Sequence, residues 1–300
     1  MIGHVEIAFL GFGLMGGSIA RAVRAANWTV DGAAVRLAAW SPSGGGCGAA
    51  LAEGVIDRVA ATVAEATASA DLVVIAAPPL ASLDLLDLLA DRRTIRLGAG
   101  TVVTDVASTK ALIVGRAAAL GLPFVGGHPM AGLETTGYAS SRGDLFVDRP
   151  WVVVPMAAAD ERVAIVEDLA RRVGARPVRM DASTHDRAVA GISHLPLLLA
   201  AALVGAVAGP APDAEPDDWL AARALAAAGW RDMTRLARGD ATMAAGIAVT
   251  NAAALAGQVR AVQAELDAWL AELEAGDGPD ADRIRERFAA IRRRLDDPAR

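Results

Sequence analysis

Side chains able to perform acid–base chemistry are concentrated in three short segments. The first runs from Asp105 to Lys110 (Asp-Val-Ala-Ser-Thr-Lys), and the second runs from Gly126 to Glu134 (Gly-Gly-His-Pro-Met-Ala-Gly-Leu-Glu). The third is Ser-His-Leu-Pro at 193–196, with His185 nine residues upstream of its histidine. Three of the chain's four histidines therefore lie in or near these segments. An imidazole, with an ordinary pKa of about 6.5, exchanges protons near neutrality, so the pattern predicts a general acid–base site.

A Gly-x-Gly-x-x-Gly motif precedes these segments, at Gly11, Gly13 and Gly16. It follows a predicted buried strand at 6–10 and opens a predicted helix to about residue 26, which is the context that the motif requires. The first glycine permits a tight turn, the second lets the backbone approach a pyrophosphate, and the third lets helix and strand pack closely. The helix N-terminus then favours the phosphates of a dinucleotide. The predicted cofactor contacts are Gly11, Gly13, Leu14, Met15, Gly16, Ser41, Ser43, Ala77 and Pro78.

The residues expected to meet the adenosine ribose leave the cofactor open between NAD and NADP. Trp40 ends the second predicted strand and is followed by Ser-Pro-Ser at 41–43, with no carboxylate to bind a 2′-hydroxyl. Two hydroxyls can bind a 2′-phosphate instead, although no arginine lies beside them. The sequence therefore favours NADP slightly over NAD.

The predicted elements place the three polar segments along one edge of a sheet. Strands predicted at 6–10, 36–40, 72–77, 101–106, 124–127, 151–155 and 177–180 alternate with helical patterns, which predicts an open parallel sheet. Ser108 and His128 follow successive strands and are expected to face one crevice, with His128 in a stiff, exposed turn. Structural alternatives remain: Ser108 could cap its helix, and His185 and His194 could bond backbone carbonyls between domains.

No strand is predicted after Met180, where long Ala/Leu-rich helices are expected at 183–208, 217–238, 242–275 and 280–295. We expect a dinucleotide-binding domain at 1–180 and a helical dimerisation and substrate domain at 181–300. The apolar run at 195–209 is short for a membrane span and is interpreted as a buried helix. Helices this apolar have more hydrophobic surface than one copy covers, which predicts a homodimer.

Composition excludes several other classes of function. The net charge is −6 and no long Lys/Arg run occurs, so neither nucleic acid nor a membrane is an expected partner. The single cysteine, Cys47, and the lack of Cys/His spacing predict no metal site, and the absence of a signal peptide predicts a cytoplasmic protein. Lys110 is the only lysine among 29 basic residues, which hints at a position where arginine would not serve.

Taken in order, the motifs resemble those of the prephenate/arogenate dehydrogenase family. They are the glycine loop, Asp-x-x-Ser-x-Lys, Gly-Gly-His-Pro-Met-Ala-Gly-x-Glu, Ser-His-Leu-Pro and Gly-Trp-Arg-Asp-Met-Thr-Arg at 229–235, and the resemblance covers about residues 5 to 270. It implies NAD(P)-dependent oxidative decarboxylation of prephenate to 4-hydroxyphenylpyruvate in tyrosine biosynthesis, or of arogenate to tyrosine. It also implies a Rossmann-type domain joined to an all-α dimerisation domain.

The resemblance also implies roles for individual residues. His128 would be the catalytic histidine, Ser108 would bond the same substrate hydroxyl, and Arg235 would bind a substrate carboxylate. Glu134, His185 and His194 would line the substrate pocket. Many family members have a further histidine where this chain has Leu197, which leaves the choice between prephenate and arogenate open.

Two other readings remain open. Another two-domain NAD(P) reductase, such as a hydroxyacid dehydrogenase or an imine reductase, would share the glycine loop and a helical second domain. It would not explain the 126–134 run, and hydroxyacid dehydrogenases of that type use a lysine in the helical domain, where this chain has none. The second is a cofactor-binding sensor, which would have the same fold but would not catalyse a reaction.

Overall fold

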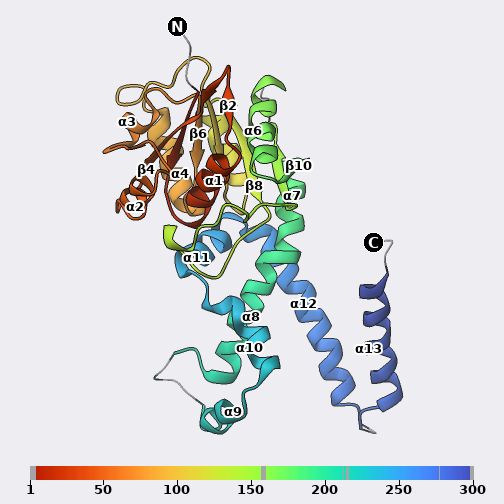
Figure 1. Ribbon diagram of the computed structural model, residues 1–300. Coiled ribbons are helices and arrows are strands. Elements are labelled where there is room, and N and C mark those ends of the chain that lie inside the picture. Colours follow the sequence, from red (N-terminus) through yellow and green to blue (C-terminus); the bar gives the residue numbers. More distant parts are fainter. Residues whose placement is uncertain (1–4, 157–159, 212, 214–215, 277, 298–300) are drawn as a thin grey trace.

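The computed structural model describes residues 5–156, 160–211, 213, 216–276 and 278–297. An α/β domain lies at one end of the molecule and an all-helical domain at the other, joined through α7 (Figure 1). The predicted fold class is therefore confirmed.

Eight strands form the main sheet, in the order β10-β9-β8-β7-β6-β1-β4-β5. Their bounds are β1 Glu6–Leu10, β4 Arg36–Trp40, β5 Arg58–Val59, β6 Leu72–Ile75, β7 Val102–Asp105, β8 Phe124–Pro129, β9 Pro150–Val154 and β10 Arg176–Arg179. A separate hairpin joins β2 (Thr29–Val30) to β3 (Ala33–Ala34).

Helices cover both faces of this sheet, which explains why its central strands are continuously apolar. Phe9 and Val74 point to one face, into a core shared with α1 and α6, whereas Leu10 and Ile75 point to the other, against α4 and α5. The helices of this domain are α1 Leu14–Ala25, α2 Cys47–Ala52, α3 Val63–Thr67, α4 Pro79–Ala90, α5 Ala111–Ala119 and α6 Asp160–Arg172.

The expectation of a wholly parallel sheet is wrong at one pair of strands. β8 and β9 are antiparallel, with His128 opposite Val152, while every other described pair in the main sheet is parallel. A parallel pair needs a crossover, usually a helix, to carry the chain back. The connection at 130–149 contains only the single 3₁₀ turn Tyr138–Ser140, so the chain returns directly in the opposite direction.

The helical domain is more broken than the sequence predicts. Its elements are α7 Ala182–Val189, a π-helical turn Ala190–His194, α8 Leu195–Ala208, α9 Trp219–Leu225, α10 Ala228–Thr234, a 3₁₀ turn Arg235–Arg238, α11 Ala241–Thr250, α12 Ala252–Leu273 and α13 Ala281–Asp296. The predicted helix at 242–275 is two helices bent by 93°. The bend lies at Asn251, whose backbone leaves the helical region.

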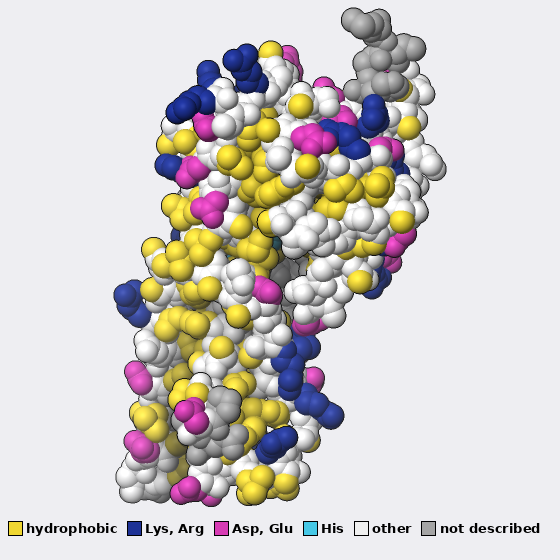
Figure 2. Space-filling model, turned by 90° about the vertical axis from the view of Figure 1, so that its left-hand side faces the viewer, with side chains coloured by type: hydrophobic (Ala, Val, Ile, Leu, Met, Phe, Trp, Pro, Cys, Tyr) yellow, Lys and Arg dark blue, Asp and Glu magenta, His cyan; other side chains and the backbone are white. Residues whose placement is uncertain are grey.

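The prediction of a buried helix at 195–209 is wrong for the single chain. Only Leu195 and Ala200 of α8 are buried. By length and composition alone the stretch Ala182–Ala208 could cross a membrane, a test that core helices of soluble proteins also pass. Hydrophobic side chains gather over the helical domain in Figure 2. Large, well-exposed examples are Leu220, Leu225, Phe288 and Leu295.

Candidate active site

The glycine loop between β1 and α1 has the geometry that a dinucleotide site requires. Gly11 has φ +89°, and a Cβ there would lie 2.5 Å from the carbonyl oxygen of Ala76. A Cβ on Gly16 would lie 2.9 Å from the Gly11 carbonyl oxygen, so helix and strand pack too closely for a side chain. At Gly13 the nearest atom to such a Cβ is 4.0 Å away, which leaves room in front of the loop. Leu14 and Met15 begin α1, whose first N–H groups have no partner within the helix.

A cleft of about 480 Å³ opens beside this loop, at the carboxyl ends of β1 and β4. Its lining includes Gly13 and the predicted ribose contacts Ser41 and Ser43, whose hydroxyl oxygens are 3.5 Å apart. Among the described residues that line it, none is a lysine, arginine, aspartate or glutamate. Ala77 and Pro78 are half-buried in the turn that joins β6, the strand next to β1, to α4.

Tyr138, which the sequence analysis did not single out, forms one wall of the cleft. Its ring stacks on Phe12 with 5.5 Å between centroids, and its hydroxyl donates to Glu53 at 2.8 Å. Burial and the hydrogen bond to Glu53 raise the pKa of Tyr138 to about 12, so the phenol stays neutral. A Cβ on Gly46 would lie 2.3 Å from the Tyr138 Cβ, so the loop after β4 needs glycine there.

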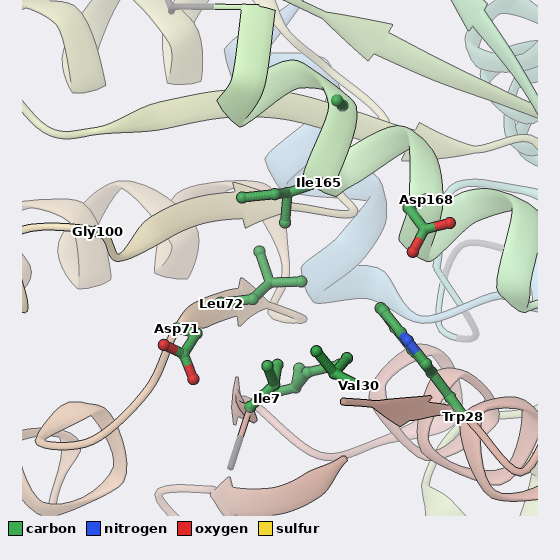
Figure 3. Close-up of a pocket in the computed structure, with 10 residues that line it drawn as sticks. Ile7, Trp28, Val30, Asp71, Leu72, Gly100, Ile165 and Asp168 are labelled. Atoms are coloured by element: carbon green, nitrogen blue, oxygen red, sulfur yellow. The ribbon is translucent and has the colours of Figure 1, made fainter. Parts of the chain in front are cut away.

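A second hollow lies at the opposite edge of the sheet, at the amino ends of β1 and β6 (Figure 3). Apolar side chains such as Ile7, Leu72 and Ile165 line it, and its two carboxylates are Asp71 and Asp168. One Asp71 oxygen accepts a hydrogen bond from the backbone N–H of Glu6, at 2.8 Å. The glycine loop and His128 lie at the carboxyl ends of their strands, on the opposite side of the sheet. This hollow is therefore separate from the candidate site.

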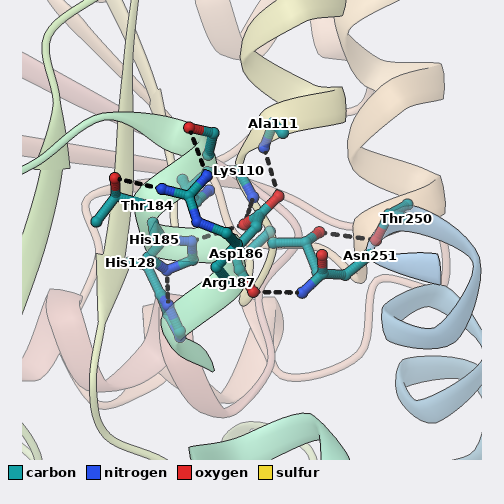
Figure 4. Close-up of polar contacts among 12 residues, drawn as sticks. Lys110, Ala111, His128, Thr184, His185, Asp186, Arg187, Thr250 and Asn251 are labelled. Atoms are coloured by element: carbon teal, nitrogen blue, oxygen red, sulfur yellow. Dashed lines mark hydrogen bonds and ion pairs between the residues drawn. The ribbon is translucent and has the colours of Figure 1, made fainter. Parts of the chain in front are cut away.

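His128 belongs to strand β8 and is buried, with 8 % of its surface exposed, so the prediction of an exposed turn is wrong. Pairing of its segment with β9 extends the strand through Pro129, and the imidazole packs edge-on against the ring of His185. Its Nδ1 lies 2.8 Å from Nε2 of His185, whose own Nδ1 lies 2.7 Å from Oδ1 of Asp186 (Figure 4). His185 therefore contacts another histidine and a carboxylate rather than a backbone carbonyl.

Asp186, also missed by the sequence analysis, joins the two domains. Its carboxylate accepts hydrogen bonds from the backbone N–H groups of Lys110 (2.7 Å) and Ala111 (2.8 Å), at the N-terminus of α5. An acidic group at a helix N-terminus is stabilised both by these bonds and by the helix dipole. A hydrogen bond between the hydroxyls of Thr109 and Thr250, at 2.7 Å, strengthens the same seam.

His194 and Ser108 each hold a buried polar atom without a partner. The Asn251 amide nitrogen donates to the backbone oxygen of Asp186 (2.9 Å) and lies 3.1 Å from Nδ1 of His194. Within the described part of the chain, Nε2 of His194 and Oγ of Ser108 have no hydrogen-bond partner. Ser108 therefore does not cap α5, which begins after Lys110. Because buried polar atoms are normally satisfied, two orphans near one cluster indicate a polar ligand.

A fully buried ion pair supports the end of β7. Nζ of Lys110 contacts a carboxylate oxygen of Asp105, and both side chains are inaccessible to solvent. Asp105 also accepts from the backbone N–H groups of Ala107 (3.1 Å) and Gly127 (3.0 Å), the latter next to His128. This packing gives the lone lysine of the chain a physical reason, since a compact ammonium fits where a guanidinium would need more room.

Arg235 and Glu134 form an ion pair outside the histidine cluster. Their side chains are 56 % and 45 % exposed, and Arg235 lies in the 3₁₀ turn that follows α10. Among the described residues, no hydrogen bond links this pair to His128, His185 or His194. The structure thus groups the predicted substrate residues into a buried histidine cluster and a separate, solvent-exposed ion pair.

Burial keeps two of the histidines neutral. The pKa of His128 lies well below its ordinary 6.5, because burial disfavours the imidazolium and the neighbouring His185, Lys110 and His194 add to the effect. Burial likewise lowers the pKa of His194 to about 4, although Asp186 opposes that shift. Near neutral pH His128 is therefore in the form that accepts a proton.

These depressed pKa values predict that acid destabilises the fold well above the range where carboxylates titrate. An unfolded histidine takes up a proton near pH 6.5, whereas folded His194 does so only near pH 4. Between these values the unfolded chain binds more protons, so stability is fully present above pH 6.5 and is lost as pH falls. We expect a loss of up to about 1.4 kcal/mol per pH unit for each such histidine. Urea unfolding at pH 7 and pH 5 measures this loss of stability. The His194→Asn variant is expected to show a weaker dependence of stability on pH. Equal stability of the wild-type chain at both pH values would contradict the prediction.

Two family models cover most of the chain. The model described as prephenate dehydrogenase, nucleotide-binding domain, matches residues 19–179, and the one described as prephenate dehydrogenase, dimerization domain, matches residues 181–289. The chain belongs to the prephenate dehydrogenase family. The resemblance found in the sequence is thereby confirmed, although the first match begins after the glycine loop.

Individual relatives agree with this assignment. A prephenate dehydrogenase of Lactococcus lactis is 30 % identical over 256 residues, which are 82 % of this chain and 65 % of that protein. A cyclohexadienyl dehydrogenase of Zymomonas mobilis is 30 % identical over 83 % of this chain and 82 % of its own length. The crystal structure of Synechocystis arogenate dehydrogenase superposes with a TM-score of 0.75 at 28 % identity, covering 97 % of this chain and 100 % of that one. The chain spans slightly less than two thirds of the length of the L. lactis protein.

Proposed function

We propose that the chain is an NAD(P)-dependent dehydrogenase that converts prephenate to 4-hydroxyphenylpyruvate by oxidative decarboxylation, in tyrosine biosynthesis. The observation that carries the proposal is the buried, neutral His128, held by His185, in a chain of this family. Ser108 follows β7 and His128 ends β8, so both come from neighbouring parallel strands at the edge that bears the glycine loop.

His128 acts as the general base in this proposal. It removes the proton of the ring hydroxyl at C4, while Ser108 donates a hydrogen bond that orients the same oxygen. A nicotinamide bound beside the glycine loop would supply the hydride acceptor for C4. The oxidised ring is a vinylogous β-keto acid, so the ring carboxylate leaves as CO₂ and its electrons complete an aromatic phenolate, whose oxygen takes back the proton that His128 removed. His194 and His185 line the pocket, and Arg235 holds a substrate carboxylate through two parallel hydrogen bonds.

Arogenate dehydrogenase is the alternative function. The two substrates differ only by a keto or an amino group on the side chain, and relatives with both kinds of name resemble this chain. Leu197 lies where many family members have a histidine, so one polar contact is absent. Among the residues proposed to line the pocket, Glu134 is the carboxylate that could face an ammonium, and Arg235 neutralises it in this structure.

The cofactor, the domain roles and the assembly belong to the same proposal. Residues 1–180 bind the dinucleotide, with a slight preference for NADP because Ser41 and Ser43 offer hydroxyls and no carboxylate. The preference is small because the cleft lining has no basic side chain for a 2′-phosphate. Residues 181–300 form the substrate and dimerisation domain, where a second copy covers the exposed apolar side chains, and the enzyme works in the cytoplasm.

A grid of four assays tests the function. Reduced cofactor is followed at 340 nm with prephenate or arogenate, each with NAD and with NADP. Turnover with prephenate exceeding that with arogenate supports the proposal, and the reverse favours the alternative. Four blanks from folded protein that binds cofactor would refute both and leave the sensor or other-reductase readings.

Removing the guanidinium of Arg235 is expected to weaken substrate binding more than catalysis. A hydrogen bond to a charged group contributes about 1.5–3 kcal/mol, so Arg235→Gln should raise KM by about 10- to 150-fold with a much smaller change in kcat. Steady-state kinetics measure the split. Arg238→Gln, three residues along the same 3₁₀ turn, is the matched control, and an unchanged KM in Arg235→Gln would remove Arg235 from the site.

A further inference from the structure

We propose that Asp186 is a positioning residue that sets which nitrogen of His128 carries the proton, acting through His185. The inference deepens the proposed function and rests on it for the role of His128 as a base. Hydrogen bonds connect the side chain of Asp186 to that of His185, and the side chain of His185 to that of His128. Each of these hydrogen bonds is 2.8 Å or shorter. All three side chains are buried.

The direction of each hydrogen bond follows from the chemistry of its two ends. A carboxylate can only accept, so the Asp186 oxygen requires a proton on Nδ1 of His185. In the form of His185 that carries this one proton, Nε2 is an acceptor. Nδ1 of His128 must then donate to it, which leaves Nε2 of His128 unprotonated. That unprotonated Nε2 is the nitrogen that can take the substrate proton.

Asp186 is itself held rigidly, which makes it suitable for this role. Its two oxygens accept from the first backbone N–H groups of α5, at Lys110 and Ala111, and its backbone oxygen accepts from Asn251. Burial raises the pKa of the Asp186 carboxyl, but the hydrogen bonds from His185, Ala111 and Lys110 outweigh it and lower the pKa, so the group remains an anion near neutral pH. The carboxylate is thus fixed by the N-terminus of α5 and by His185, and the backbone of Asp186 is fixed by Asn251.

The charged and titratable groups around the pair do not offer a competing partner for these nitrogens. His185, Lys110 and His194 are the groups whose charges affect His128, and all of them disfavour its protonation. Lys110 directs its ammonium to Asp105, and Nδ1 of His194 lies beside the Asn251 amide. Asp186 is therefore the anion that orders the two imidazoles. When His128 takes a proton, the same anion stabilises the resulting positive charge through His185.

Nitrogen NMR of histidine-labelled protein tests the proton positions without any assay of activity. The chain has four histidines, and His→Gln variants assign their signals. We expect Nδ1-protonated, Nε2-unprotonated rings for both His128 and His185. Finding His185 protonated on Nε2 in the wild-type protein would overturn the proposal. These signals are read from the unliganded protein, so they stand even if prephenate is not a substrate.

Variants of Asp186 and His185 test the functional consequence. Asp186→Ala should give mixed proton positions on His185 and His128 and lower kcat by about 10- to 100-fold, the loss seen when carboxylates that orient metal-binding histidines are removed. His185→Gln should retain more activity than His185→Leu, because the glutamine amide can place its N–H₂ toward Asp186 and its oxygen toward His128. KM should change little in Asp186→Ala, because Asp186 is not among the residues proposed to line the pocket.

A control separates positioning from stability. Arg187→Ala alters the neighbouring, exposed position of α7, where the guanidinium contacts Ser183 and Thr184, and should keep wild-type kcat. A folded Asp186→Ala protein with a lower Tm but unchanged kcat and proton positions would show that Asp186 only anchors α5, and would refute the proposal. Expected NMR signals in a wild-type protein that does not turn over either substrate would refute the proposed function alone.

Discussion

His128→Asn is expected to lower kcat by about 10²- to 10⁴-fold, the contribution typical of a well-placed general base. Asparagine is close to histidine in size, and its amide can still hydrogen-bond His185, so the packing at the end of β8 should survive. It cannot accept a proton near neutral pH, whereas His128 is neutral and buried there. Because the glycine loop and the cleft beside it do not include His128, the dissociation constant of the cofactor should stay near its wild-type value.

Two measurements make this expectation specific. Kinetics at 340 nm give kcat, and tryptophan fluorescence gives cofactor binding, so a loss confined to kcat separates chemistry from folding. Ser108→Ala should lose less than His128→Asn, because the serine supplies orientation and no proton acceptor. Wild-type turnover by His128→Asn, with prephenate or with arogenate, would remove the residue from the mechanism.

The sheet was predictable because its strands are buried on both faces. Runs such as 7–10 and 72–75 are wholly apolar and alternate with helices, a pattern that belongs to few architectures. The antiparallel return of β9 was not predictable in this way, since composition does not report strand direction. It depends on the connection at 130–149, where the loop lacks the crossover helix that a parallel strand needs.

The helical domain was predicted in outline but not in its breaks. Apolar spacing continues through Asn251, so it indicates one helix where the chain bends by 93°. The asparagine side chain donates to the backbone oxygen of Asp186 in α7, a tertiary contact within the helical domain that local sequence does not encode. Burial of α8 was overestimated for a related reason: hydrophobicity indicates that a surface is covered, and not whether the same chain or another copy covers it.

The candidate site was likewise predictable in part: residue type and spacing revealed some of its residues, and tertiary packing the others. His128, Ser108 and the glycine loop stand out by residue type and spacing, and the structure places them at the expected strand ends. In the sequence, Asp186 was only weakly indicated as a site residue, by its position next to a histidine. The packing of α7 on α5 shows that its carboxylate accepts hydrogen bonds from two backbone N–H groups and an imidazole. The pairing of Arg235 with Glu134 joins segments about a hundred residues apart, which spacing alone cannot reveal.

Breaking the buried ion pair at the end of β7 is expected to cost more stability than any other single change discussed. Lys110→Met leaves the Asp105 carboxylate fully buried, with two backbone N–H groups but no cation, and removing one partner of a buried pair typically costs about 3–5 kcal/mol. Urea unfolding curves, fitted for both the midpoint and the slope, measure the loss in the free energy of unfolding. Arg116→Met, which breaks an exposed ion pair with Asp87, should unfold at nearly the wild-type urea concentration.

A double variant distinguishes the charge from the packing. Combining Lys110→Met with Asp105→Asn removes the orphaned charge, so it should recover part of the lost stability, because a buried pair replaced on both sides is often close to neutral. Lys110→Arg should remain destabilised despite keeping the charge, since the site is closed around an ammonium. If Lys110→Met stays within about 1 kcal/mol of the wild type, as exposed pairs do, then the pair does not stabilise the fold. The lone lysine would then need another explanation, and the nearest one on structural grounds is the electrostatic environment of His128, whose pKa the ammonium helps to lower.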